Sequence, residues 1–358
     1  MSGRQENDLA DRHNTGRRRF VSAAGSTLAL AAMPFVATKA RAAGQLVFAG
    51  FGGTYQTGQQ KALFEPFEKE TGIKIVQTTG VDLAKLRAQV QSGNVEWDFV
   101  SLPDRLRYTA VRDGLVVPLD YGVIDARKIV PALVTPQAVG GVTIPMLMAY
   151  STKAFAGKTP PRTWKDFWNV DGLPGQRGMY NGPVYSLEFA LIADGVPKDK
   201  LYPLDLDRAF KSMDKIKSRV VWWSQMAQPG PLLQSGEIVV TPSVRAITAM
   251  LEGEPLAVSY EGAALTYEAW VVPKGTKNSA DAMKFINFAL QPRQQAELTK
   301  YIAYGPTNAD AAGMVDPKAR PHLSSNPENA AKGFLLSGDY WGANLDKVTE
   351  RWNEWRLS

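Results

Sequence analysis

Side chains that usually act as nucleophiles, general bases or metal ligands are scarce in this sequence of 358 residues. There is no cysteine, and the two histidines are His13 and His322. These residues cannot build a cysteine nucleophile, a His-x-x-x-His zinc site or a Cys₂His₂ metal site within one chain. A Ser-His-Asp triad would depend on His322 in the segment ARPHLSSNP, and the sequence has no nucleophile elbow. We therefore expect no metal, no cofactor and no catalytic residue.

Carboxylates, arginines and aromatic side chains remain as the groups that could meet a ligand. Paired acids suffice for glycoside hydrolysis, so a secreted carboxylate-dependent hydrolase stays open beside a binding protein that performs no reaction. A structural or adhesive secreted protein is the third alternative. The glycine-rich stretch GFGG at residues 50–53 lacks the spacing of a dinucleotide or phosphate-binding loop.

The first 42 residues have the features of an export signal. Three arginines precede an Ala- and Gly-rich apolar run at residues 20–37, which Pro34 interrupts, and residues 40–42 read ARA, a typical cleavage site. A membrane-spanning helix needs about 20 strongly apolar residues, so an anchor fits poorly. The segment RRRFV at residues 17–21 resembles the twin-arginine export signal. We expect cleavage after residue 42 and a periplasmic protein, with an ordinary Sec signal as the alternative.

Removal of this segment changes the charge balance. It takes away seven of the 41 Lys and Arg and three of the 35 Asp and Glu, so the net charge falls from +6 to +2. No basic stripe remains, which argues against a nucleic-acid partner. The remaining 316 residues can bury a core without disulfides, and their length predicts more than one domain.

The elements that must position any site alternate between strand and helix, which predicts a parallel sheet with helices on its faces. In the first part, Leu86 and Val90 continue an apolar face between Asp82 and Gly93, as in an amphipathic helix. The strands predicted there are 46–49, 73–78 and 97–102, and the helices are 59–70, 82–93 and 103–113.

The later part of the chain predicts a second α/β unit over residues 179–259. Two crossing strands, 142–146 and 147–151, precede it, and a strand at 268–273 follows it. Ser279 is expected to cap a helix over 280–290, Pro292 to open the next helix, and residues 346–356 to form a tryptophan-bearing helix.

Five segments in order resemble the periplasmic solute-binding proteins of ABC importers, in the spermidine/putrescine-binding branch. They are LFEPFEKETGIKIV (63–76), SGNVEWDFVSLP (92–103), TWKDFWN…GLPGQRGMY (163–180), LLQSGEIVV (232–240) and WVVPKGTKNSADAMKFINFALQP (270–292). The resemblance implies an α/β fold of two lobes, type II-like, with two parallel-rich sheets joined by hinge strands. It also implies a small-molecule solute bound between the lobes and an inner-membrane ABC permease as partner. We expect a monomer whose N-terminal lobe comprises residues 43–148 and 267–308, and whose C-terminal lobe comprises 149–266 and 309–358.

Open parallel sheets bind ligands beyond the carboxyl ends of their strands, so residues at those ends are candidates. After the first strand, Gly52 and Gly53 allow backbone N–H groups to approach a ligand, and a tight turn is the alternative role. The resemblance implies that Tyr55 lines the cleft. It also places Asp104 at a ligand-contacting position, where this acid could receive an ammonium group or simply begin a helix.

The resemblance implies further contacts in the second half. Glu268 aligns with an acid that grips an amine in polyamine-binding relatives, although the tryptophan two positions earlier is Thr266 here. The second acid of the polyamine clamp should lie near residues 181–185, where this sequence offers Asn181 and Tyr185 instead.

Three more candidates come from the residues themselves. Arg245 follows a predicted strand at a helix start, and a guanidinium binds a carboxylate with two parallel hydrogen bonds. A salt bridge at the surface or between lobes is its alternative role. In the segment VVWWSQMAQPG (220–230), Trp223 could cover a cation and Ser224 could bond a polar solute. At least one of the two tryptophans, Trp222 and Trp223, is expected in the core.

A dication needs an acid or an aromatic cage at each end, and this sequence keeps one acid. We therefore expect an amino acid-like zwitterion, such as a γ-aminobutyrate-like compound, or a small organic acid. Polyamine binding is the alternative, and a hydrolase is less well supported.

Overall fold

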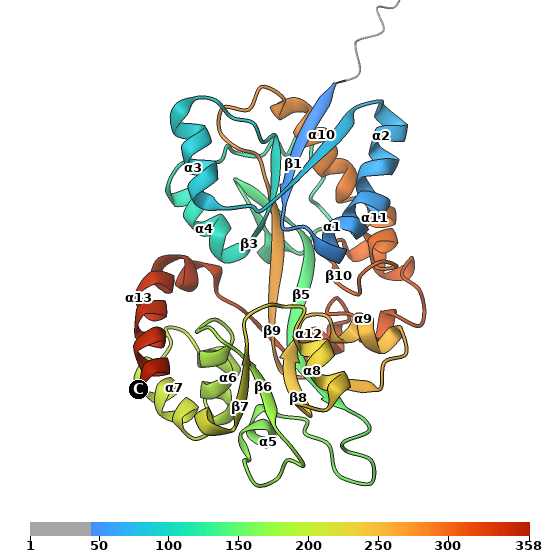
Figure 1. Ribbon diagram of the computed structural model, residues 1–358. Helices are drawn as coiled ribbons and strands as arrows, with labels where there is room; N and C mark the ends of the chain where they lie inside the picture. Colours follow the sequence, from blue (N-terminus) through green and yellow to red (C-terminus); the bar gives the residue numbers. More distant parts are fainter. Residues whose placement is uncertain (1–43) are drawn as a thin grey trace, which may run out of the picture. The chain divides into compact units, whose positions relative to one another are not determined.

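The computed structural model describes residues 44–358, so the predicted export signal lies outside it (Figure 1). One mixed sheet of 11 strands runs through these residues, with the order β2-β1-β3-β9-β5-β8-β6-β7. The short strands β4 (Val134–Thr135) and β10 (Gly305–Pro306) pair with β5, and β11 (Phe334–Leu335) pairs with β9. Within this part of the chain, every helix is too short or too polar to cross a bilayer.

The first half of the sheet confirms the predicted alternation of strands and helices. Strand β1 (Gln45–Gly50) lies parallel to both β2 (Lys74–Thr79) and β3 (Phe99–Pro103). Asp82 caps α3 as predicted, because its side chain accepts from the Ala84 N–H, and Gly93 ends the helix in a left-handed conformation. The predicted helix 59–70 is longer, because a π-helical turn joins two α-helices. The helices of this half are α1 (Gly53–Gln59), η1 (Gln60–Phe64), α2 (Glu65–Thr71), α3 (Leu83–Ser92) and α4 (Asp104–Arg112).

The second half repeats this arrangement. Its strands β6 (Arg177–Tyr180), β7 (Val220–Trp223) and β8 (Val240–Ser243) are parallel. The helices that belong to this half are α5 (Trp164–Trp168), α6 (Ser186–Ala193), α7 (Leu206–Asp214), α8 (Pro229–Ser235), α9 (Ala246–Leu251), α12 (Pro327–Lys332) and α13 (Gly338–Leu357).

Two long antiparallel strands, β5 (Ala138–Ser151) and β9 (Leu256–Val271), connect the halves (Figure 1). The predicted crossing strands 142–146 and 147–151 are therefore one strand, whose register shifts between Met146 and Met148. The strand predicted at 268–273 is the end of β9. Because β5 and β9 pair along their length, backbone hydrogen bonds join the two expected sheets into one.

Separate hydrophobic cores mark the two halves. One core draws its buried side chains from residues 46–144 and 267–304. A second gathers residues from 146–240 with Trp341, Val348 and Trp352 of α13. The predicted lobe boundaries stay a prediction.

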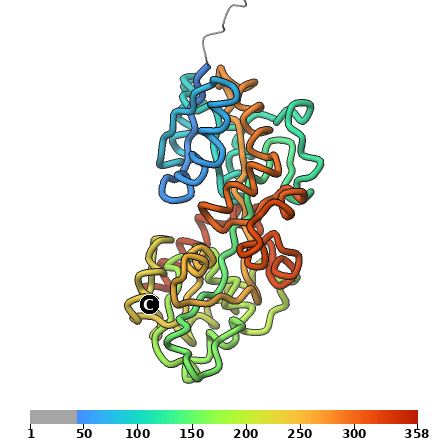
Figure 2. Tube along the Cα trace, turned by 90° about the vertical axis from the view of Figure 1, so that its right-hand side faces the viewer, coloured from blue at the N-terminus to red at the C-terminus, as the bar shows by residue number. Residues whose placement is uncertain are grey.

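Helix α10 (Ser279–Ala289) returns the chain to the first half, where it lies beside η1 and α2 (Figure 2). The Phe285 ring packs 5.5 Å from Phe64 and 5.3 Å from Phe67. The predicted cap was wrong by one residue: Asn278 precedes the helix, and its side chain makes no capping hydrogen bond. Pro292 begins α11 (Pro292–Leu298), as predicted.

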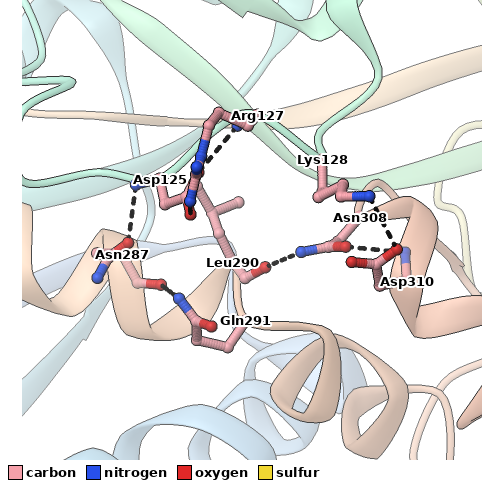
Figure 3. A network of polar contacts seen from close by, with 8 residues as sticks. All are labelled: Asp125, Arg127, Lys128, Asn287, Leu290, Gln291, Asn308 and Asp310. Atoms are coloured by element: carbon pink, nitrogen blue, oxygen red, sulfur yellow. Dashed lines mark hydrogen bonds and ion pairs between the residues drawn. The ribbon is translucent and has the colours of Figure 1, made fainter.

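A polar network fastens the loop at residues 125–128 to the end of α10 (Figure 3). The Asp125 N–H donates to Asn287 Oδ1 at 2.9 Å, and Asn308 Nδ2 donates to the Leu290 carbonyl at 2.9 Å. Lys128 forms an ion pair with Asp310 at 3.6 Å. These bonds hold the loops that surround the first core.

Candidate functional site

Several candidate residues lie near the carboxyl ends of β1 and β3, beside Glu268 of the antiparallel strand β9. In the ladder between β3 and β9, Pro103 lies opposite Glu268, so the start of α4 lies beside this glutamate. Tyr55 stands in α1 directly beyond β1. Glu268 influences the pKa of Tyr55, which indicates that the two side chains are close. The structure thus unites two residues that are more than 200 positions apart in the sequence.

Glu268 is the central acid of this cluster. Its side chain is buried, with 8% of the residue exposed, and Ser101 Oγ donates to Oε2 at 3.0 Å. Burial raises the pKa of Glu268 to about 7, although the Ser101 hydrogen bond and the nearby charge of Arg105 both act to lower it. A carboxyl in this state is poised to ionise when a cation arrives.

Three tyrosines surround this acid. The rings of Tyr55 and Tyr304 lie 5.4 Å apart, and burial together with the Glu268 charge raises both pKa values. Tyr185 is buried on the other half of the molecule, and burial raises its pKa to about 12. The charges of Arg105, Glu268 and Glu188 all act on this hydroxyl.

Tyr185 also has an unusual backbone. Its φ is 71°, and no other non-glycine residue between 44 and 358 has a positive φ. A bulky residue in the left-handed region is strained, and such strain is concentrated at functional sites. Gly52 and Gly53 have φ values of 79° and 68°, which glycine adopts at little cost. In this conformation the Gly52 N–H donates to Gln56 Oε1 at 2.8 Å.

Two arginines complete the cluster. Arg105 acts on Glu268 and Tyr185, and Arg245 acts on Tyr304. Both guanidinium groups are half-buried, and neither forms an ion pair with any residue in 44–358. Among the charged groups that act on Tyr55, Glu268 and Tyr304, the cluster holds two cations against one acid, and that acid, Glu268, has a pKa of about 7. Within residues 44–358, no set of three or more His, Asp or Glu side chains gathers as a metal site.

Asp104 takes a different place from the one expected for an ammonium receptor. Its carboxylate accepts from Arg107 Nε at 2.6 Å, and Tyr267 lies beside it. Arg107 also reaches Asp339 at 3.3 Å. These contacts already satisfy Asp104, so a role in ligand binding stays a prediction that the geometry does not favour.

The remaining candidates follow β6 and β7. Trp223 is 1% exposed, and its Nε1 donates to Thr241 Oγ1 at 2.9 Å, so its indole lies in the core. Asn181 is exposed and donates its N–H to the Trp223 carbonyl at 2.7 Å. Ser224 is exposed in the loop, where its N–H donates to Gln228 Oε1 at 2.8 Å. The structure does not bring these three side chains into contact with Glu268.

Comparison with known proteins explains this arrangement. A family model described as bacterial extracellular solute-binding protein matches residues 62–325. A γ-aminobutyric acid-binding protein of Pseudomonas aeruginosa is 34% identical over 344 residues, which cover 92% of this chain and 96% of the relative. The chain belongs to the bacterial extracellular solute-binding protein family.

Further relatives of this solute-binding protein support the same fold and role. A solved GABA receptor shares 35% identity at a TM-score of 0.82, covering 87% of this chain and 97% of the receptor. The binding protein AgtB of A. tumefaciens R10, solved with agropinic acid, shares 38% identity at a TM-score of 0.76, covering 88% and 99%. A spermidine/putrescine-binding periplasmic protein of Haemophilus influenzae is 26% identical, over 78% of this chain and 79% of the relative. The solute-binding protein therefore has the two-lobe α/β fold, acts in the periplasm as the binding component of an ABC importer, and has a small-molecule ligand and a membrane permease as partners.

Sequence reasoning missed three members of the cluster in this solute-binding protein. Arg105 stands inside the segment that was recognised as ligand-contacting, but its neighbour Asp104 was selected. Ser101 lies on β3, which pairs with the strand that carries Glu268. Its place near the end of the predicted strand 97–102 was a signal that could have indicated it. Tyr304 follows α11 in an irregular segment, and nothing in its sequence neighbourhood predicted contact with Tyr55.

Proposed function

We propose that this protein captures a small zwitterion with one ammonium and one carboxylate group, such as γ-aminobutyrate, and delivers it unchanged to an ABC permease. The observation that carries the proposal is the charge balance around Glu268. One buried carboxyl lies among two guanidinium groups without acidic partners, Arg105 and Arg245. Glu268 can receive the ammonium, and one or both arginines can bind the carboxylate.

The same balance disfavours a polyamine. A dication would add two positive charges to a cluster that already contains one more cation than anion. A buried ammonium without a partner costs several kcal/mol, and no second acid faces the far end of the cluster. A dicarboxylate would place an anion beside Glu268. Because the pKa of Glu268 is about 7, that arrangement is favourable only while the Glu268 carboxyl is protonated.

Three four-carbon solutes test this proposal directly. γ-Aminobutyrate, putrescine and succinate have chains of the same length and differ only in their terminal groups. Ligand binding raises the melting temperature by mass action, so thermal shift ranks the three. We expect the largest shift with γ-aminobutyrate. A larger shift with putrescine would overturn the charge argument. Recovery of γ-aminobutyrate in altered form would show that the protein is an enzyme.

Substitution of the arginines tests which group binds the carboxylate. We expect Arg105→Ala or Arg245→Ala to weaken γ-aminobutyrate binding by more than about 2 kcal/mol, because a desolvated charge would lose its partner. Arg127→Ala is the control, since Arg127 is exposed and pairs only with Asp125. Calorimetric titration measures all three variants. Wild-type affinity in both site variants would exclude a carboxylate contact at these positions.

The export route and assembly also belong to this proposal. RRRFV at residues 17–21 favours the twin-arginine pathway. Replacement of Arg17 and Arg18 by lysine should then block appearance in the periplasm, whereas a Sec signal would tolerate it. We further propose a monomer, with lobes of residues 43–148 plus 267–308 and 149–266 plus 309–358. Analytical ultracentrifugation tests the first point, and hinge positions in open and closed crystal forms test the second.

A further inference from the structure

A second buried acid, Glu188, lies outside the charge cluster and has no role in the proposed contacts. It stands in the first turn of α6 and is fully buried, with 0% exposed. Its Oε1 accepts from the Tyr202 hydroxyl at 2.7 Å and from Trp341 Nε1 at 2.6 Å. Among the described residues, Oε2 has no hydrogen-bond partner. A core position that needed only packing would be better served by leucine, because burying a carboxylate is costly.

On one side, Glu188 reaches toward Tyr185. Tyr185 immediately precedes α6, and Glu188 follows it by three residues, the spacing at which a glutamate can turn back to the start of its helix. Burial raises the pKa of the Glu188 carboxyl to about 7. The first turn of the helix carries Glu188 and is bonded to Tyr185, because the Phe189 N–H donates to the Tyr185 carbonyl at 2.9 Å. Glu188 thus lies within one turn of the strained backbone of a tyrosine whose hydroxyl is also influenced by Glu268.

On the other side, Glu188 holds the start of α13 through Trp341. The residues just before Trp341 lie against α4 of the other half, where Asp339 pairs with Arg107 at 3.3 Å. Gly338 is so close to Asp104 that a Cβ there would overlap the carboxylate. Helix α4 begins with Asp104 and Arg105. Glu188 therefore contacts elements that support two cluster residues, Tyr185 in one half and Arg105 in the other.

We propose that Glu188 is a positioning residue of the solute site, which holds Tyr185 in its positive-φ conformation and fixes α13 against α4. The inference rests on the proposed function only in assuming that the solute meets Tyr185 and Arg105. Glu188 itself touches no solute. Its action passes through the Tyr202 and Trp341 hydrogen bonds and the backbone at Tyr185.

The experiment uses four variants of the full mature chain with γ-aminobutyrate as probe. Glu188→Leu removes both hydrogen-bond acceptors, and Glu188→Gln restores one. Tyr202→Phe removes one donor to Glu188. Tyr260→Phe is the matched control, because the buried Tyr260 hydroxyl donates a single hydrogen bond of 2.9 Å to the His322 carbonyl, away from Glu188. Titration calorimetry gives the affinity, and thermal unfolding without solute gives the stability.

We expect Glu188→Leu to weaken binding more than about tenfold and Glu188→Gln by less than about threefold, since one acceptor is regained. Tyr202→Phe should weaken binding about fivefold, whereas Tyr260→Phe should change it less than about twofold even where its stability falls equally. Equal affinities for Tyr202→Phe and Tyr260→Phe would overturn the inference. This comparison remains decisive if Glu188→Leu fails to fold.

Hydrogen–deuterium exchange without solute separates this inference from the proposed function. Glu188→Leu or Tyr202→Phe should speed exchange in segments 181–189 and 338–345, and Glu188→Gln should leave both close to wild type. If the wild-type protein binds none of the three probes, the proposed function fails, but exchange still tests the positioning role. Unchanged exchange in both segments would refute that role whatever the solute is.

Discussion

The affinity for γ-aminobutyrate should depend on the protonation of Glu268, and pH is the simplest perturbation of that group. An ammonium group needs the ionised carboxylate as its partner. In the solute-free protein, burial raises the pKa of Glu268 to about 7, so the binding-competent form is only part of the population at neutral pH. Lowering the pH should therefore weaken binding without changing the solute, whose own groups keep their charges.

The size of the effect follows from that pKa. At about pH 7.5 roughly 76% of the molecules carry ionised Glu268, and at about pH 5.5 roughly 3% do. Apparent affinity scales with the competent fraction, so the dissociation constant should rise about 25-fold, or about 1.9 kcal/mol. Binding near pH 7 should release about half a proton per solute, because the bound ammonium keeps Glu268 ionised.

Calorimetry in buffers of different ionisation enthalpy measures both quantities. Glu268→Gln is the control, and it should bind weakly with no pH dependence over this range. Glu188 is a second carboxyl whose pKa burial raises to about 7, so Glu188→Gln separates its contribution. A dissociation constant that stays constant from about pH 7.5 to about pH 5.5 would refute the proposed ammonium contact.

The sign of the pH effect also distinguishes the solute classes. A small organic acid without an amine would bind best while Glu268 is neutral, so its affinity should fall as the pH rises through about 7. The stability of the solute-free protein should also fall as the pH rises. Because the folded pKa lies above the ordinary value of 4.5, the contribution of Glu268 is complete below that value and is lost as the pH rises through about 7. The melting temperature should therefore fall over the range where γ-aminobutyrate affinity rises.

Three substitutions test the supports of the site, each measured by thermal unfolding and by titration. Gly338→Ala should destabilise the fold by about 2 kcal/mol or more, because the added methyl overlaps Asp104, whereas Gly230→Ala has open space and should be close to neutral. Trp223→Phe should cost about 1–3 kcal/mol, because it removes a hydrogen bond and leaves a cavity in the core, and it should leave affinity unchanged; a large loss of affinity alone would restore its predicted ligand contact. Thr307→Val should cost about 1–3 kcal/mol, because the buried hydroxyl bonds both a glutamine amide and a strand carbonyl; an unchanged melting temperature would contradict this.

Local patterns in the sequence predicted most of the fold, because helices and strands follow from spacing and capping. Asp82 and Gly93 fixed both ends of α3 in this way. The division of residues 142–151 into two strands was wrong, because the apolar run continues without a turn residue through one strand. The patterns also could not show the π-helical turn at residues 60–64, which alters hydrogen bonding without changing composition.

The site was predictable only where a residue follows a strand or matches a family position. Tyr55 and Glu268 were predicted in that way, and the Glu268 charge acts on the Tyr55 hydroxyl in the structure. Arg105 and Asp104 are adjacent, and sequence could not decide which of them faces the cluster. That choice depends on Arg107, one turn further along α4, which takes Asp104 as its partner at 2.6 Å. The ion pair between Asp104 and Arg107 thus leaves Arg105 as the neighbour without an acidic partner.

This local pairing bears on how solute choice can change within such a fold. Asp104 and Arg107 neutralise each other, so in the proposed site the charge offered to the solute would come from Glu268, Arg105 and Arg245. Arg107→Ala would free the Asp104 carboxylate and convert an excess of cations into a balance of two acids and two arginines. The variant should then gain affinity for putrescine relative to γ-aminobutyrate, since a second acid becomes available for the second ammonium. If putrescine binding stays undetectable while the protein remains folded, charge balance alone does not select the solute, and the strained position of Tyr185 becomes the stronger determinant.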